Sequence, residues 1–268
     1  MSVSIDRSAR VSPKAELHDG VSIGPFTIVE DDVIIGEGTY VASSALIAAG
    51  ARIGKGCHIH HGAVISAVPQ DLKFAGEKTQ VEIGDRTVVR EFVTISRGTK
   101  IRGKTSVGAD CLLMSYAHVA HDCVIGNNVI LANAVNMGGH VTIEDYAMVG
   151  GLVGIHQFVR IGCHAMVGAN FRVMKDVPPY VLAGQEPLSY EGLNIVGLKR
   201  RKFSPETIAS IRNAYHCIYN SNLNFSQAVK KIKTEMVLTD EVKHIIKFIE
   251  NSKRGIVGLR LKRRSSID

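Results

Sequence analysis

Four histidines and a glutamine lie between residues 118 and 157 of this 268-residue chain, and one histidine is followed directly by an aspartate, as His121–Asp122. An imidazole beside a carboxylate can act as a general base, because its pKa suits proton removal near neutral pH. Histidines gathered in space could instead bind zinc, for which imidazole is a common ligand, or could simply form a polar ridge. The residues concerned are His118, His121, His140, His156 and Gln157.

The elements that position these residues follow from a repeat of six. Every sixth residue from Ile5 to Val173 is aliphatic, and only Asp71 and Glu77 break this frame. A helix repeats near 3.6 residues and a strand at 2, so the pattern predicts a solenoid of six-residue faces, three to a coil. We expect the side chain of each frame residue to point into the core, together with that of the small residue four positions later. Glycines after frame residues are expected at the bends, and Ile101 is expected in a loop.

Three faces of six residues give 18 residues per coil, so residues 18 apart share a column at the spacing of neighbouring strands, about 4.8 Å. This aligns His121 with Gly139 and Gln157. The other histidines lie beside that column. The repeat therefore gathers all of them on one ridge of consecutive coils, which favours a general base or a zinc site over scattered polar residues.

Composition narrows the setting of the protein. No apolar run is long enough for a transmembrane helix, and the first residues lack the apolar core of a signal peptide. The five cysteines form no CxxC pair, and Cys57, Cys111 and Cys123 occupy inward slots of the repeat. Buried free thiols are typical of a reducing compartment, so we expect a cytoplasmic protein.

The chain changes character after Val173, where the paired prolines of DVPPY (176–180) interrupt the repeat. We predict a β-helix over residues 1–180 and a linker with an α-helical domain over residues 181–268. Helix spacing and capping residues predict helices beginning at Ser204, Ser226 and Thr239. The tail from Ser252 is basic and is expected to be loosely held.

Charge divides along the same boundary. Residues 199–268 carry 16 Lys and Arg against 6 Asp and Glu, a net charge of +10, which leaves −3 for the rest of a chain whose total is +7. A basic helical domain suits an acidic partner, either a protein, a nucleotide or nucleic acid. Nucleic acid is the least favoured of these, because no aromatic residues are interleaved with the basic ones.

Several motifs together resemble one enzyme family, the UDP-N-acetylglucosamine O-acyltransferases that begin lipid A synthesis in Gram-negative bacteria. The resemblance spans essentially the whole chain. The repeat alone is shared with many acyltransferases and with hexapeptide carbonic anhydrases, but QDLKF, AHVAHD and GLKRR in combination are specific. The motifs are VPQDLKFAGE (68–77), EFVTISRGT (91–99), AHVAHDCVIGNNVILAN (117–133), HQF (156–158), DVPPYV (176–181) and NIVGLKRRKFS (194–204).

The resemblance implies a mainly β fold, a left-handed parallel β-helix followed by C-terminal helices, assembled as a homotrimer with active sites between subunits. It implies transfer of a 3-hydroxyacyl group from acyl carrier protein to the 3-hydroxyl of UDP-N-acetylglucosamine. No metal or dissociable organic cofactor is implied, because the acyl group arrives as a thioester on the phosphopantetheine arm of the carrier. The resemblance implies neither binding to nucleic acid nor a transmembrane segment.

The resemblance also assigns roles to residues. It makes His121 the general base, Asp122 its orienting partner, and the Gly139 amide the donor to the oxyanion. Substrate contacts are implied for Gln70, Asp71, Lys73, His118, His140, His156, Gln157, Asn194, Arg200 and Arg201, and an acyl groove for Gly151 and Ala169.

Three positions depart from the family pattern. Val196 stands where a glutamate is usual, Ala169 where a glycine often lines the acyl groove, and Pro187 where a histidine is associated with its far end. The preferred acyl length and the acceptor group, a 3-hydroxyl or a 3-amino group, are therefore left open. Two other hypotheses about function remain beside the acyltransferase. One is a zinc lyase of the hexapeptide carbonic anhydrase type, and the other is a non-catalytic scaffold that binds a carrier protein.

Overall fold

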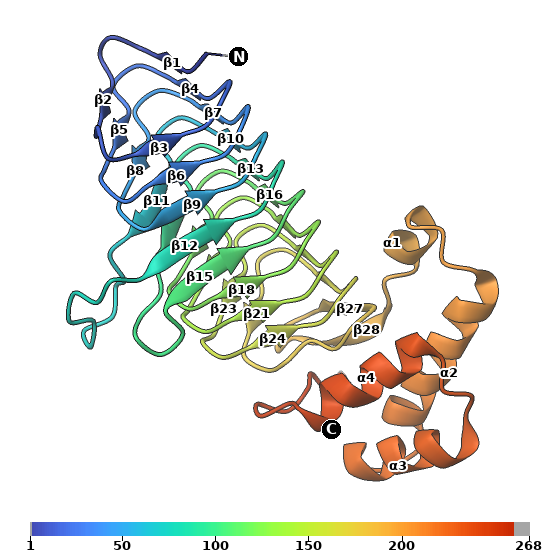
Figure 1. The fold of residues 1–268 in the computed structure, drawn as a ribbon. Coiled ribbons are helices and arrows are strands. Elements are labelled where there is room, and N and C mark those ends of the chain that lie inside the picture. The colour runs from blue at the N-terminus through green and yellow to red at the C-terminus, as the bar shows by residue number, and fades with distance from the viewer. Residues whose placement is uncertain (1, 260–268) are drawn as a thin grey trace, which may run out of the picture.

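The computed structural model describes residues 2–259 and consists of a long left-handed parallel β-helix with a group of helices at its C-terminal end (Figure 1). Three sheets form the three faces of the coil. The first face contains β1 (Ser4–Ile5), β4 (Ser22–Ile23), β7 (Tyr40–Val41), β10 (His58–Ile59), β13 (Val88–Val89), β16 (Leu112–Leu113), β19 (Ile130–Leu131), β22 (Met148–Val149), β25 (Met166–Val167), β27 (Val181–Gly184) and β28 (Ser189–Leu193).

The other two faces are parallel throughout. The second face contains β2 (Arg10–Val11), β5 (Ile28–Val29), β8 (Leu46–Ile47), β11 (Val64–Ala67), β14 (Thr94–Ser96), β17 (His118–Val119), β20 (Asn136–Met137), β23 (Gly154–Ile155) and β26 (Arg172–Val173). The third face contains β3 (Glu16–Leu17), β6 (Ile34–Ile35), β9 (Ala51–Ile53), β12 (Gln80–Ile83), β15 (Lys104–Val107), β18 (Val124–Ile125), β21 (Thr142–Ile143) and β24 (Arg160–Ile161).

The repeat of six builds the core as predicted. Frame residues from Ile23 onward are almost all buried, and so are the small residues four positions later, such as Thr39 and Cys57. Glycine plays a different part from the one expected. The bends at positive φ lie three residues after the frame, at residues such as Asp122. A glycine such as Gly36 is needed instead because coils approach closely there: a Cβ at Gly36 would lie 2.6 Å from the Gly54 carbonyl carbon.

Two loops interrupt the coils and change their register. Residues 68–79, which carry the two breaks in the frame, join β11 to β12, and residues 97–103 join β14 to β15 (Figure 1). Ile101 lies in the second loop with 72% of its surface exposed, which confirms that it is no core residue. Strand partners are therefore 30 residues apart across the first loop (His58 with Val88) and 24 across the second (Thr94 with His118). They are 18 apart in the regular coils (His118 with Asn136) and 16 apart where β25 meets β27.

The C-terminal helices are α1 (Ile195–Arg200), α2 (Pro205–Asn220), α3 (Phe225–Glu235) and α4 (Asp240–Glu250). The predicted caps Ser204 and Thr239 are confirmed, because each side chain accepts a hydrogen bond from the first turn of its helix. The prediction for the middle helix was wrong. Asn224, not Ser226, caps α3, and the Gln227 side chain completes a capping box by accepting from the Asn224 N–H. Sequence spacing also missed the short α1.

One face of the β-helix continues past the paired prolines of residues 176–180, which were expected to interrupt it. The repeat of six ends with β26 at Val173, but β27 resumes the first face beside β25, and β28 pairs antiparallel with β27. The proposed boundary at residue 180 stays a prediction. The expectation of a loose tail was wrong for residues up to 259, because Ile256 and Val257 are buried and the Val257 N–H donates to the Asp176 carbonyl oxygen. The rest of the tail lies outside the described residues.

Two tyrosines of α2 hydrogen-bond to segments outside the helices. The Tyr215 hydroxyl donates to the Pro179 carbonyl oxygen at 2.6 Å, and Tyr219 donates to the Val257 carbonyl oxygen at 2.8 Å. Both rings are buried. Within residues 2–259, no helix combines the length and the hydrophobicity needed to cross a membrane.

Candidate active site

The histidine ridge forms at the corner between the second and third faces. His121 and Asp122 follow β17, Gly139 and His140 follow β20, and Gln157 follows β23. Asp122 and His140 occupy equivalent bends of neighbouring coils, with φ of 59° and 62°. The predicted column is therefore present. It brings side chains from three coils to one corner because the turns repeat at an interval of 18 residues.

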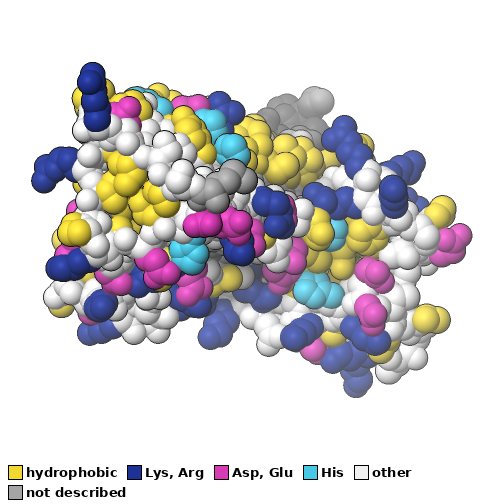
Figure 2. Space-filling model, turned by 45° about the horizontal axis from the view of Figure 1, so that its top comes forward, with side chains coloured by type: hydrophobic (Ala, Val, Ile, Leu, Met, Phe, Trp, Pro, Cys, Tyr) yellow, Lys and Arg dark blue, Asp and Glu magenta, His cyan; other side chains and the backbone are white. Residues whose placement is uncertain are grey.

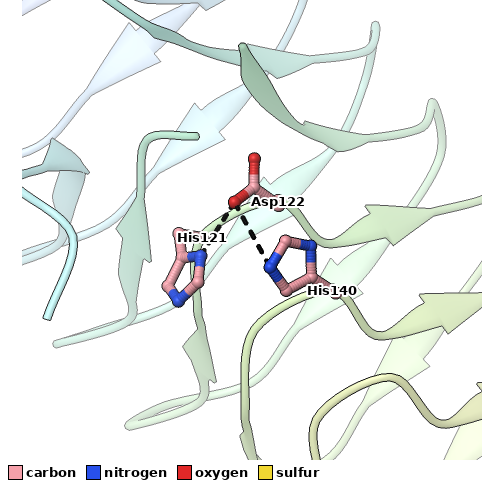
Figure 3. Close-up of side chains that lie close together, drawn as sticks. All are labelled: His121, Asp122 and His140. Carbon is pink, nitrogen blue, oxygen red and sulfur yellow. Dashed lines mark hydrogen bonds and ion pairs between the residues drawn. The ribbon is translucent and has the colours of Figure 1, made fainter. Parts of the chain in front are cut away.

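The centre of the site is a contact between His121 and Asp122 (Figure 3). His121 Nδ1 lies 2.8 Å from Asp122 Oδ2, and His140 Nε2 approaches the same oxygen at 3.8 Å. An ionised carboxylate only accepts hydrogen bonds, so His121 Nδ1 is the donor in this contact. Nε2, on the other side of the ring, lies 3.9 Å from Asp71 Oδ2.

Asp122 forms hydrogen bonds with Thr99 and Thr105, two residues that the sequence analysis did not identify. It is completely buried, and Thr99 donates to it twice, from its N–H to Oδ1 at 3.0 Å and from its hydroxyl to Oδ2 at 2.7 Å. Thr105 Oγ1 accepts from the Asp122 N–H at 2.8 Å. Burial acts to raise the pKa of Asp122, but the hydrogen bonds from His121 and Thr99 outweigh it and lower this pKa. The carboxylate therefore stays ionised beside the imidazole.

Gly139 lies directly against the His121 ring. A Cβ at this position would come within 2.5 Å of His121 Cε1 and 2.6 Å of Nε2, so a side chain would displace the imidazole. Among residues 2–259, no group accepts a hydrogen bond from the Gly139 N–H. A free amide beside a basic nitrogen can stabilise an oxyanion that forms as the nitrogen removes a proton.

A groove passes along this corner, and most of the predicted substrate residues line it. His118 is one of them, and its Nδ1 lies 2.7 Å from Thr94 Oγ1. Burial lowers the pKa of His118, and burial likewise lowers that of His140 although Asp122 opposes the effect. The first loop closes one side of the groove. The predicted residues in its lining are Gln70, Asp71, Lys73, His118, His121, Gly139, His140 and Gln157.

Comparison with known proteins identifies the family. A family profile described as "Udp N-acetylglucosamine O-acyltransferase; Domain 2" matches residues 176–257, and a bacterial transferase hexapeptide profile matches residues 14–49, 32–67 and 104–139. The acyl-[acyl-carrier-protein]–UDP-N-acetylglucosamine O-acyltransferase of Chlorobaculum parvum is 55% identical over 94% of this chain and 96% of its own length. The chain belongs to the UDP-N-acetylglucosamine O-acyltransferase family.

Solved structures of the family agree with this assignment. LpxA from Acinetobacter baumannii matches with a TM-score of 0.92 at 40% identity, over 94% of this chain and 99% of that one. LpxA from Bacteroides fragilis, a UDP-N-acetylglucosamine acyltransferase, matches with the same TM-score at 45% identity and the same coverage. These matches confirm the predicted β-helix with C-terminal helices.

Some predicted site residues lie at other corners of the same chain. The Asn194 side chain caps α1 and donates to the His164 carbonyl oxygen, while the Arg201 guanidinium lies 4.0 Å over the Tyr146 ring. Tyr146 and His164 follow β21 and β24, one whole face beyond His121. Within one chain, the following predicted residues do not line the groove: Asn194, Arg200, Arg201, His156, Gly151 and Ala169.

One alternative from the sequence places a zinc ion among three histidines of this ridge. His118 is paired with Thr94, and the residues with ligand atoms within 4.8 Å of one another are His121, Asp122 and His140. In this trio the shared carboxylate oxygen already accepts from His121 and Thr99. These two hydrogen bonds hold the carboxylate in place beside the His121 imidazole.

Proposed function

We propose that this chain transfers a 3-hydroxyacyl group from acyl carrier protein to the 3-hydroxyl of UDP-N-acetylglucosamine, the first step of lipid A synthesis. The observation that carries the proposal is the His121–Asp122 pair, which lies in a groove with His121 against the Gly139 amide. The family to which the chain belongs supports the same reaction. With five free cysteines and a carrier-bound donor, we place the protein in the cytoplasm.

The chemistry needs only groups that the corner and the substrates supply. His121 Nε2 removes the proton of the sugar 3-hydroxyl as its oxygen attacks the thioester carbonyl carbon. The carbonyl oxygen becomes an oxyanion, to which the Gly139 N–H donates. Collapse of this intermediate breaks the carbon–sulfur bond, and the imidazolium returns the proton to the departing phosphopantetheine thiolate. Asp122 and Asp71 favour the imidazolium while it exists. No metal or organic cofactor enters this scheme.

The remaining binding residues complete the site only if subunits share it. Asn194, Arg200 and Arg201 suit a uridine diphosphate, because guanidinium groups bind phosphate oxygens, but they lie one face away from His121. A homotrimer can bring the Arg201 corner of one subunit against the His121 corner of the next. The helical domain carries many Lys and Arg side chains (Figure 2, right), and we propose that they attract the acidic carrier protein.

The test is acyl transfer from a series of 3-hydroxyacyl carrier proteins to UDP-N-acetylglucosamine. We expect one preferred chain length, and we expect His121→Ala to lower kcat by about 10²- to 10⁴-fold, the usual contribution of a general base. His216→Ala is the matched control, because His216 is exposed on α2. Near-normal activity of a folded His121→Ala protein would exclude His121 as the base. Transfer only to a 3-amino sugar would redefine the acceptor.

A further inference from the structure

A second cluster of chemically capable side chains lies where α4 meets the third face of the β-helix. It consists of Glu144, which follows β21, Cys163, which follows β24, and His244 of α4. One ligand atom from each lies within 4.8 Å of the others, and His244 Nε2 is 2.7 Å from Glu144 Oε2. None of the three lines the groove at His121, so the cluster is separate from the proposed acyl-transfer site.

The donor set matches one class of ion. Thiolate, imidazole and carboxylate are the three side-chain ligands that zinc takes in proteins, often three at a time with water in the fourth position. A thiolate disfavours magnesium and calcium, which prefer oxygen. Glu144 keeps 21% of its side-chain surface exposed and His244 keeps 38%, so an ion and its water have a path to the cluster from solvent.

Neighbouring groups orient the ligands as outer partners do at known metal sites. The Cys163 N–H donates to Glu144 Oε2 at 3.0 Å, and Arg160 Nη2 lies 3.5 Å from Glu144 Oε1. Arg160 is itself fixed, with its guanidinium 4.1 Å over the Phe248 ring and a hydrogen bond to the Phe248 carbonyl oxygen. The carboxylate is thereby held at both oxygens: Oε1 faces Arg160, and Oε2 accepts from the Cys163 N–H and lies beside His244.

We propose that Glu144, Cys163 and His244 bind one zinc ion that links α4 to the β-helix. The ion takes the place of the proton between His244 and Glu144 and of the thiol proton of Cys163, so both protons leave for solvent on binding. The ligands come from two coils and a helix that are distant in sequence and adjacent only in the folded chain. Binding therefore stabilises the attachment of the helical domain.

The experiment measures zinc bound to the full-length protein, purified without a histidine tag, after zinc loading and removal of excess metal. We expect one equivalent per chain in the wild type, and loss of this zinc in Cys163→Ser and His244→Asn. Cys217→Ser and His216→Asn are matched controls on α2 and should keep it. A chelator should lower the Tm of the wild type and of the controls but leave both ligand variants unchanged.

A spectroscopic measurement on the wild type is informative even if the variants do not fold. Cobalt bound in place of zinc should give a thiolate-to-cobalt charge-transfer band and the intense visible bands of a tetrahedral site. The proposal is overturned if wild-type protein holds no zinc, if cobalt gives no thiolate band, or if zinc persists in folded Cys163→Ser. Loss of the zinc in His140→Asn, with retention in His244→Asn, would assign it to the His121 corner and would equally overturn the proposal.

Discussion

At the scale of single residues, the proposed chemistry depends on which nitrogen of His121 carries the proton. Asp122 fixes this through its contact with Nδ1, and Thr99 fixes Asp122 through two hydrogen bonds. The chain Thr99–Asp122–His121 thus runs from a buried residue of the second loop to the groove. Its first members do not line the groove, yet in the proposed reaction they determine that Nε2 is the basic atom.

Replacement of the buried carboxylate tests this chain. In Asp122→Asn the side chain loses its charge, no longer stabilises the imidazolium, and presents an amide that can hold the wrong tautomer. We expect kcat to fall by about 10²- to 10⁴-fold with a small change in KM. Asp110→Asn is the matched control, because Asp110 occupies an equivalent bend with φ of 56° but pairs with Arg86. A kcat close to that of the wild type would show that Asp122 does not orient the base.

His118 gives a prediction about stability rather than rate. Burial, and secondarily His121, lower its pKa in the folded chain. Below the ordinary pKa of about 6.5 the unfolded chain binds a proton that folded His118 does not, so stability should decrease as pH falls from 7 toward 5. Urea unfolding at pH 8 and pH 5.5, at one protein concentration, measures the difference. We expect a smaller difference in His118→Asn; an unchanged difference would contradict the assignment.

At the scale of elements, the correction at α3 can be tested directly. Asn224 accepts from the Gln227 N–H at 2.9 Å, whereas Ser226 is exposed within the first turn. We expect Asn224→Ala to lower the free energy of unfolding by about 0.5 to 2 kcal/mol, the usual cost of losing a cap. Ser226→Ala should be neutral or slightly stabilising, because alanine is the better helix former. If thermal or urea unfolding showed that Ser226→Ala lowers the free energy of unfolding as much as Asn224→Ala does, Ser226 would have to be accepted as a cap of α3.

Much of the fold could be predicted because each coil repeats the same physical requirement. An aliphatic residue at every sixth position is the condition for filling a narrow core, so Val119 and Met137 predicted the column of His121 and Gly139. Thr99 could not be found this way. It lies in the loop that changes the strand offset from 18 to 24 residues, and its contact with Asp122 depends on how that loop folds. With the 24-residue offset known, Thr94 would have been placed beside His118.

The cap of α3 shows a second limit of the sequence. Asn224 and Ser226 are both good N-cap residues two positions apart, and spacing alone does not choose between them. The choice follows from Gln227, whose side chain accepts from the N–H of Asn224 three residues earlier. The missed α1 is six residues long, too short for a periodic pattern, and is defined by the Asn194 side chain that caps it.

At the scale of the whole molecule, the separation between His121 and Arg201 has a consequence for assembly. Both residues are proposed to contact one substrate. The third face of the β-helix nevertheless separates the corner of His121 from the corner of Tyr146, over which Arg201 lies. If neighbouring subunits supply the two halves, a closed trimer contains three such sites, and every subunit contributes one half to each of two sites.

Mixed trimers test this arrangement. His121→Ala subunits and subunits carrying Arg200→Ala with Arg201→Ala should each form inactive homotrimers. Co-expressed with different affinity tags and purified through both, every mixed trimer contains one site in which an intact His121 faces an intact arginine pair. We expect such trimers to recover roughly one third of wild-type activity, because one of three heterologous interfaces is complete. Mixed trimers as inactive as the parents would mean that each chain builds its site alone, and light scattering on the same samples would establish whether three chains assembled.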